Sequence, residues 1–179
     1  IVESGAGVLF IVKNYSGDIM NFQMASEIMT VASETVLIND DVAVEDSSFT
    51  TGRRGVAATV IVEKIVGSFA ETGGNLKECK ILGDKVNKNS GSMGVAFSSC
   101  SVPDAGKATF IVGSDELEFG VCIDGEPGRR RDKVQPAQKI TSSILLFLKN
   151  LSTFFLSNKF NSDLDFTIIF LKLFFFNNV

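Results

Sequence analysis

Residues 7–12, GVLFIV, form an uninterrupted apolar run that ends in the polar turn KNYSGD. A continuous apolar run of this length is typical of a strand covered by helices on both faces. Apolar residues then recur at helical spacing, at Met20, Phe22, Met24, Ala25, Ile28 and Met29. The β-branched run ETVLIND at 34–40 predicts a second strand. Strand, helix and strand within about 30 residues predict a right-handed βαβ unit with parallel strands.

Residues 55–139 continue this pattern. GVAATVIVEKIVGSFAETGG at 55–74 predicts a buried helix ended by its two final glycines, and 75–88 predicts another helix. After NSGSMG, three short apolar segments predict strands of a second sheet: GVAFSSCSV, KATFIV and ELEFGVCI. The sequence therefore predicts an α/β fold, in which a parallel-rich sheet with flanking helices is followed by the start of a second small α/β lobe.

Residues 140–179 differ in composition and hold nine of the sixteen Phe residues. One interpretation, which the composition favours, is translated A/T-rich DNA unrelated to the preceding domain. The other is an amphipathic helix in which Leu145, Phe147 and Leu151 share one face. The longest apolar run, at 166–176, is interrupted by Lys172 and is too short to cross a bilayer. We therefore expect no membrane partner.

The chain contains no histidine. No imidazole is available for proton transfer near neutral pH, which excludes Ser-His-Asp, Cys-His and His-rich metal sites. Cys79, Cys100 and Cys122 lack a metal-ligand spacing and favour buried thiols in a reducing compartment. The net charge of −4 gives no indication of a nucleic-acid partner. The first residues, IVESGAG, lack the basic region of a signal peptide, so we expect a cytoplasmic location.

The turn KNYSGD is the strongest candidate site. Ligands of open α/β sheets bind beyond the carboxyl ends of parallel strands, which is where this turn is predicted to lie. Gly17 would allow a tight turn, and Asp18 is placed at the predicted N-cap of the next helix. On the turn alone, the simpler reading is favoured: Asp18 only caps the helix and Lys13 is a solvated side chain.

Two basic segments are weaker candidates. TTGRRGVAA at 50–58 places two arginines before a helix N-terminus, where an anion could bind, and a solvated loop or an intersubunit salt bridge is as good an interpretation. DGEPGRRRDK at 124–133 reads as a solvated loop. The glycines of GAGVLF precede their strand, and no GxxxxGK[ST] occurs, so the sequence predicts no nucleotide site.

Four segments closely resemble, in order, the substrate-binding K domain (DhaK) of dihydroxyacetone (glycerone) kinases. They are GVLFIVKNYSGDIMNF, NDDVAVEDSSFTTGRRGVAATVIVEKI, SMGVAFSSCSVP and ELEFGVCIDGEPGRRR. The resemblance implies two α/β lobes with a three-carbon ketose held between them. It makes residues 1–91 the C-terminal half of an incomplete first lobe and 92–139 the start of the second, and it leaves 140–179 outside the family.

The resemblance also implies roles for individual residues. Lys13 would hydrogen-bond the substrate, and Asp18 would act as general base on the hydroxyl that attacks the phosphoryl group. Phosphoryl transfer needs positioning and a nearby base more than covalent chemistry, so these roles are physically reasonable. Family members bind the substrate carbonyl as a covalent hemiaminal on a histidine, and Asp124 stands at that position here. A carboxylate cannot form a stable hemiaminal.

The resemblance places the phosphoryl donor outside this chain. It would be ATP with Mg²⁺, or an ADP recharged by a phosphotransferase system, on a separate helical nucleotide-binding L domain or subunit. No cofactor is therefore expected here, and a homodimer is implied.

Four functions remain open at this stage. The first is a fragment of a kinase that converts dihydroxyacetone to dihydroxyacetone phosphate, inactive as this chain alone. The second is a non-catalytic, ketose-binding regulatory paralogue. The third is a kinase for a related ketose such as erythrulose. The last is a truncated gene product without function.

Overall fold

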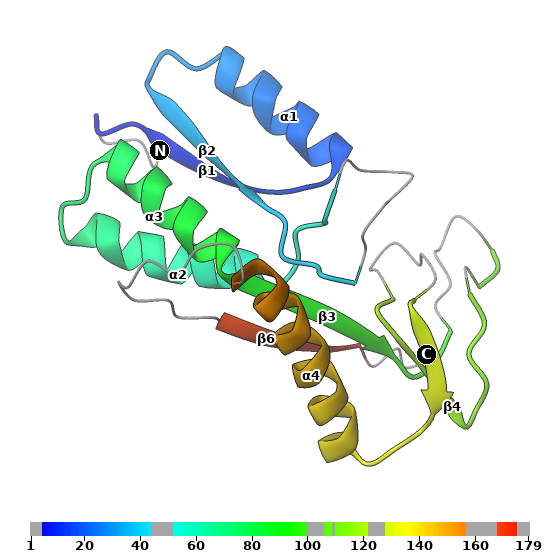
Figure 1. Ribbon diagram of the computed structural model, residues 1–179. Helices are drawn as coiled ribbons and strands as arrows, with labels where there is room; N and C mark the ends of the chain where they lie inside the picture. The colour runs from blue at the N-terminus through cyan, green and yellow to red at the C-terminus, as the bar shows by residue number, and fades with distance from the viewer. Residues whose placement is uncertain are drawn as a thin grey trace. The chain divides into compact units, whose positions relative to one another are not determined.

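The structure, a computed structural model, describes residues 5–43, 52–99, 106–108, 110–121, 128–156 and 168–174. The chain divides into two compact units (Figure 1). The first unit comprises Ile1–Asp41 and Glu45–Ser90, and the second comprises Val42–Val44 and Gly91–Val179. The main division therefore falls between Ser90 and Gly91, next to the lobe boundary expected between residues 91 and 92.

The first unit begins with the predicted βαβ motif. Strand β1 (Val8–Lys13) leads through helix α1 (Ser16–Glu27) to strand β2 (Ser33–Ile38). The two strands pair in parallel, in a register that begins at Val8 opposite Ser33 and ends at Lys13 opposite Ile38. Because the strands end at the same level, the residues that follow each strand meet at one edge of the sheet.

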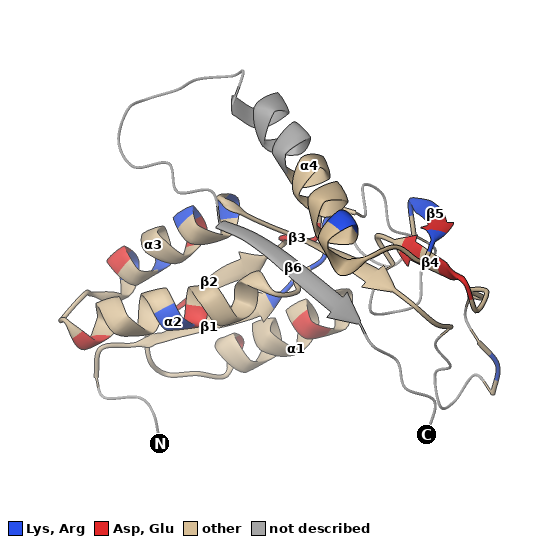
Figure 2. Cartoon of the chain, turned by 90° about the horizontal axis from the view of Figure 1, so that it is seen from below, with Lys and Arg blue, Asp and Glu red and all other residues tan. Residues whose placement is uncertain are grey.

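Helices cover both faces of this two-stranded sheet, as Figures 1 and 2 show: α1 lies on one face, and α2 (Ala58–Glu71) and α3 (Leu76–Lys88) lie on the other. α3 packs closely on β2, since a Cβ at Gly83 would lie 2.6 Å from a Val36 methyl carbon. The buried apolar residues of the unit are Val12, Val36, Ile38, Ala58, Val62, Val66, Cys79 and Val86. The predicted α/β architecture is confirmed.

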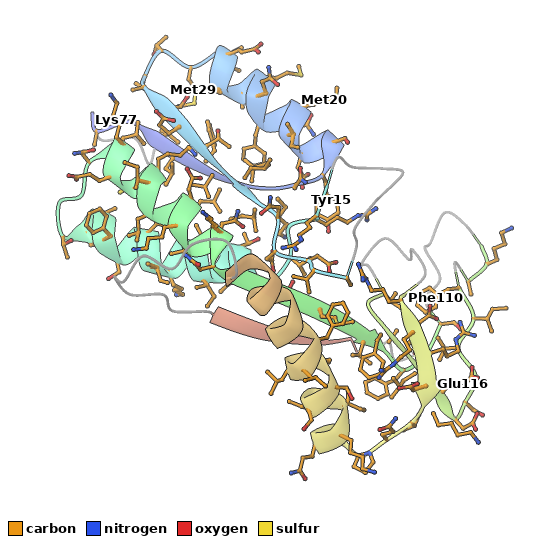
Figure 3. All side chains as sticks on the ribbon, in the orientation of Figure 1. Tyr15, Met20, Met29, Lys77, Phe110 and Glu116 are labelled. Carbon is orange, nitrogen blue, oxygen red and sulfur yellow. The ribbon has the colours of Figure 1, made fainter. Side chains whose placement is uncertain are left out.

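The side of α1 that contacts the sheet differs from the apolar stripe in the sequence, and no residue of this helix is buried. Met20, Met24 and Ile28 are 62%, 63% and 84% exposed, and Figure 3 shows Met20 on the outer side of the helix. Phe22 instead contacts Phe10 of β1 edge-on, with ring centroids 5.5 Å apart. The helix has apolar residues around much of its circumference, so their spacing alone did not identify the inner face.

The second unit contains a four-stranded sheet in the order β5-β4-β3-β6. The strands are β3 (Ser90–Ala96), β4 (Glu116–Phe119), β5 (Arg130–Lys133) and β6 (Ile168–Phe174). β4 pairs antiparallel with both β3 and β5. The strand predicted at 107–112 does not form among the described residues of that segment.

The basic run at 130–133 is part of the sheet, and the prediction of a solvated loop was wrong there. Its charges pair with those of the acidic strand β4, which lies beside it in Figure 2. Arg131 Nη2 lies 2.7 Å from Glu118 Oε2, and this hydrogen bond raises the pKa of Arg131 above its ordinary value. Cross-strand pairs of opposite charge stabilise a sheet, so a sequence that reads as a polar loop forms a strand here.

Helix α4 (Ala137–Leu156) supplies one side of the core of the second unit. Ile140, Ile144 and Leu148 are buried at helical spacing. They pack with Met93 and Val95 of β3, with Leu117 and Phe119 of β4, and with Val42 and Ala43. An amphipathic helix therefore forms in this part of the Phe-rich segment, but its buried face is not the predicted one, since Leu145 is 42% exposed.

We expect Ile144→Ala to lower the free energy of unfolding by about 2–5 kcal/mol. Ile144 is 0% exposed, so removing most of its side chain leaves a cavity in the core. Leu146→Ala, two residues along the same helix at 61% exposure, is the matched control and should change stability by less than about 0.5 kcal/mol. Urea denaturation followed by circular dichroism measures both. Equal, small effects would show that α4 does not belong to the core.

Candidate functional site

Lys13 and Asp18 lie on either side of the junction between β1 and α1. Lys13 is the last residue of β1 and is exposed, and Asp18 lies in the first turn of α1 and is half-buried. The N-cap residue is Tyr15, so the prediction that Asp18 caps the helix was wrong by three positions. Gly17 is the second residue of α1 and has no positive φ, so it forms no tight turn.

The side chains of Lys13 and Asp18 make no hydrogen bond or ion pair with any other residue in the described part of the chain. An ammonium group and a carboxylate at one end of a strand offer three donors and two acceptor oxygens to a small polyhydroxy ligand. The carboxylate also lies in the first helical turn, where the backbone dipole favours negative charge. Groups of these two kinds can bind a hydroxyl and accept its proton.

Asp40, which sequence reasoning did not single out, lies at the same edge beyond the end of β2. It is 0% exposed, and its two carboxylate oxygens accept from the backbone N–H groups of Val56 at 2.7 Å and Ala58 at 3.0 Å. It therefore caps α2 from outside the helix, whose own N-cap residue Ala57 has no side-chain cap. An anion was one of the interpretations of this N-terminus, and the carboxylate that binds there is the protein's own Asp40.

Residues 53–55, which the sequence allowed as an anion site, instead pack on the ends of the two strands. Arg54 is 0% exposed, so it is not the solvated loop residue that the sequence also allowed. Asn14, directly after β1, is 5% exposed and donates from Nδ2 to the carbonyl oxygen of Arg53 at 2.5 Å. A Cβ at Gly55 would lie 2.3 Å from the carbonyl oxygen of Ile38. This segment is packed against the carboxyl ends of both strands.

Asp124, the position that the resemblance gives to the covalent histidine, lies outside the described residues. The residues next to that interval are fixed on β4. Glu118 is 5% exposed, and its Oε1 accepts from the Gly128 N–H at 2.7 Å while Oε2 binds Arg131. Arg129 N donates to Phe119 O at 2.8 Å. β4 therefore anchors the chain directly after the interval 122–127.

No group of three or more His, Cys, Asp and Glu side chains in the described part of the chain is arranged to hold a metal ion. Among the described helices, none combines the length and apolar character needed to cross a membrane. Cys79 is a buried free thiol, as predicted, whereas Cys100 and Cys122 lie outside the described residues.

Comparison of the chain with known protein families identifies its family. The family model for the Dak1 domain matches residues 1–161. The chain belongs to the Dak1 domain family. The match includes 140–161, the first part of the segment expected to lie outside the family, and ends before 162–179.

Individual relatives agree with this assignment. The chain is 50% identical over 145 residues to the "PTS-dependent dihydroxyacetone kinase 1, dihydroxyacetone-binding subunit DhaK" of Listeria innocua, covering 79% of this chain and 44% of that protein. It is similar in structure to the "Dihydroxyacetone kinase operon co-activator Dha-DhaQ", at a TM-score of 0.73 and 31% identity, covering 86% of this chain and 48% of the other.

A third relative is the dihydroxyacetone kinase of C. freundii, solved "in complex with AMP-PNP and Mg2+". Its TM-score is 0.67 at 34% identity, covering 84% of this chain and 28% of that one. The chain thus spans less than half of the length of each of these three relatives.

We expect Asp40→Asn to lower the free energy of unfolding by about 1–3 kcal/mol, because an amide NH₂ would face a buried backbone N–H that then has no acceptor. Asp84→Asn is the matched control: Asp84 pairs with Lys80 on the surface of α3 at 2.5 Å, and its loss should cost less than about 0.5 kcal/mol. Urea denaturation compares the two variants. An equally small loss for Asp40→Asn would mean that its carboxylate does not cap α2.

Proposed function

We propose that this chain forms part of the dihydroxyacetone-binding domain of a dihydroxyacetone kinase, with Lys13 and Asp18 in the sugar site. The observation that carries the proposal is the place of the turn KNYSGD, at the carboxyl end of β1 beside the parallel strand β2, in a chain of the Dak1 family. Ligands of α/β sheets bind at this edge. The relatives whose names include this activity support the choice of ligand.

The two residues would divide the work of phosphoryl transfer. The Lys13 ammonium donates hydrogen bonds to an oxygen of dihydroxyacetone and orients the molecule. The Asp18 carboxylate accepts the proton of the terminal hydroxyl as that oxygen forms its bond to the phosphorus atom and the donor's leaving oxygen departs. The products are dihydroxyacetone phosphate and the unphosphorylated donor. Positioning and one base suffice, which fits a chain without histidine.

The phosphoryl donor belongs to a partner in this proposal. A separate L domain or subunit would bring ATP with Mg²⁺, or a recharged ADP, to the hydroxyl. The C. freundii structure with AMP-PNP and Mg²⁺ supports the first kind of donor, and the PTS-dependent relative supports the second. The homodimer implied by the resemblance stays a prediction.

The roles of Lys13 and Asp18 can be separated by kinetics in the protein expressed from its gene, assayed with an L-type partner. Asp18→Asn should lower the transfer rate at saturating dihydroxyacetone at least about a hundredfold while leaving the sugar affinity nearly unchanged, because it removes only the base. Lys13→Met should weaken sugar binding about tenfold through the lost charged hydrogen bond.

Matched controls are Glu27→Gln, at the other end of α1, and Lys77→Met, on the exposed face of α3. Neither should change rate or affinity. A transfer rate that survives Asp18→Asn would remove the base assignment, and unchanged binding by Lys13→Met would remove Lys13 from the sugar site.

A regulatory, ketose-binding role is a second candidate, which two observations favour. Asp124 occupies the position that the resemblance gives to the covalent histidine, and the chain is similar in structure to an operon co-activator. A protein of this kind would bind the sugar by hydrogen bonds, without a covalent bond and without phosphoryl transfer.

A kinase for a related ketose such as erythrulose would need only differently shaped surroundings for the ligand at the same turn.

Asp124→His separates the first two candidates. If the unmodified protein is a kinase that lacks only the covalent histidine, the imidazole nitrogen of the variant should add to the carbonyl carbon of dihydroxyacetone. The imidazole proton would then end on the carbonyl oxygen. The protein mass would then rise by that of one dihydroxyacetone molecule. Asp124→Asn, which cannot form this bond, is the control. If Asp124→His binds the sugar but gains no mass, the regulatory role is favoured.

A further inference from the structure

The start of α1 lacks the side-chain cap found at many helices. Its N-cap residue Tyr15 has an extended backbone, with φ of −127° and ψ of 137°, and its side chain makes no capping hydrogen bond. Ser, Thr, Asp and Asn are the usual residues at this position. Tyr15 N donates to Lys13 O at 2.8 Å, and Ile19 N donates to Tyr15 O at 2.9 Å. The direction in which α1 leaves β1 is set by these local bonds together with contacts from other segments.

Arg53, Arg54 and Gly55 supply such contacts. Arg53 O accepts from the Asn14 side chain, as described above. The Arg54 guanidinium carbon lies 5.6 Å from the centroid of the Tyr15 ring, which Figure 3 shows at the junction of β1 and α1. A Cβ at Gly55 would lie 2.8 Å from the Cα of Lys13. The segment therefore touches each of the three residues where strand changes to helix.

This segment is in turn held on the end of β2. The backbone N–H of Asp41 donates to Arg54 O at 2.9 Å, and the Asp40 carboxylate binds the two amides at Val56 and Ala58. The backbone of Arg54 is thus fixed to one parallel strand while its side chain lies over a ring at the end of the other. The two strand ends are thus joined by the Asn14 backbone N–H, which donates to Ile38 O at 2.9 Å, and by this segment.

We propose that Arg54 is a positioning residue for the Lys13–Asp18 turn and that it acts through the ring of Tyr15. The inference rests on the proposed function in taking this turn as the sugar site. A guanidinium over an aromatic face, away from water, holds the ring in place by charge and by stacking. Because Tyr15 is the N-cap residue of α1, the position of this ring sets where Asp18 lies relative to Lys13.

Four variants of the protein expressed from its gene test this role. Tyr15→Leu removes the aromatic face, and Tyr15→Phe, the matched control, keeps it. Arg54→Met removes the charge, and the double variant Tyr15→Leu with Arg54→Met tests coupling between them. The measurements are the dissociation constant for dihydroxyacetone and the hydrogen-exchange rate of the Ile19 amide, with the Cys79 amide of α3, bonded to Asn75 O at 2.9 Å, as internal reference.

We expect Tyr15→Leu and Arg54→Met each to weaken sugar binding about tenfold, the effect of losing a desolvated cation–π contact. Exchange at Ile19 should become faster while exchange at Cys79 stays unchanged. Tyr15→Phe should match the parent. The double variant should lose less affinity than the sum of the two single losses, because both substitutions remove the contact between Tyr15 and Arg54.

Each other outcome is decisive. Unchanged affinity in Tyr15→Leu, additive losses in the double variant, or equal acceleration at Ile19 and Cys79 would overturn the positioning role. If the unmodified protein does not bind dihydroxyacetone, the proposed function fails, but the exchange rates still test the contact between Arg54 and Tyr15. Faster, non-additive exchange at Ile19 alone supports this contact. Unchanged exchange at Ile19 refutes it. If Arg54→Met does not fold, the pair of Tyr15 variants decides, since Tyr15 is only half-buried.

Discussion

The buried carboxylate of Asp40 organises the carboxyl edge of the parallel strands. A fully desolvated charge is tolerated only when hydrogen bonds compensate it, and here two backbone amides at the start of α2 do so at 2.7 and 3.0 Å. The same bonds hold residues 53–55 against the end of β1. The position of the KNYSGD turn therefore depends on an interaction formed by the neighbouring strand.

Much of the first unit could be predicted because its signals are local. Residues close together in the sequence indicate the strand at 7–12, the helix that ends before Gly73 and Gly74, and the helix at 75–88. The face of α1 and the strand β5 could not be predicted in this way. The first depends on which apolar side chain meets Phe10, and the second depends on acidic partners in β4, more than ten residues away in the sequence.

The candidate site shows the same limit. Lys13 and Asp18 could be proposed because they lie in one short turn after a recognisable strand, and a family resemblance implied roles for them. Asp40 and Asn14 were missed, and Arg54 was read as part of an anion site or a loop. Each acts through backbone groups or a ring that only the folded chain brings near. The sequence allowed an anion at the start of α2, and the folded chain places the Asp40 carboxylate there.

The way in which Glu118 holds Gly128 and Arg131 has a consequence for how such domains diverge. One carboxylate fixes the backbone just past the interval 122–127, and Val121 before it is buried beside β4. The hydrogen bonds of Glu118 run to Gly128 and Arg131, so a substitution within 122–127 removes none of them, and the strands can keep their pairing while the chain between them changes.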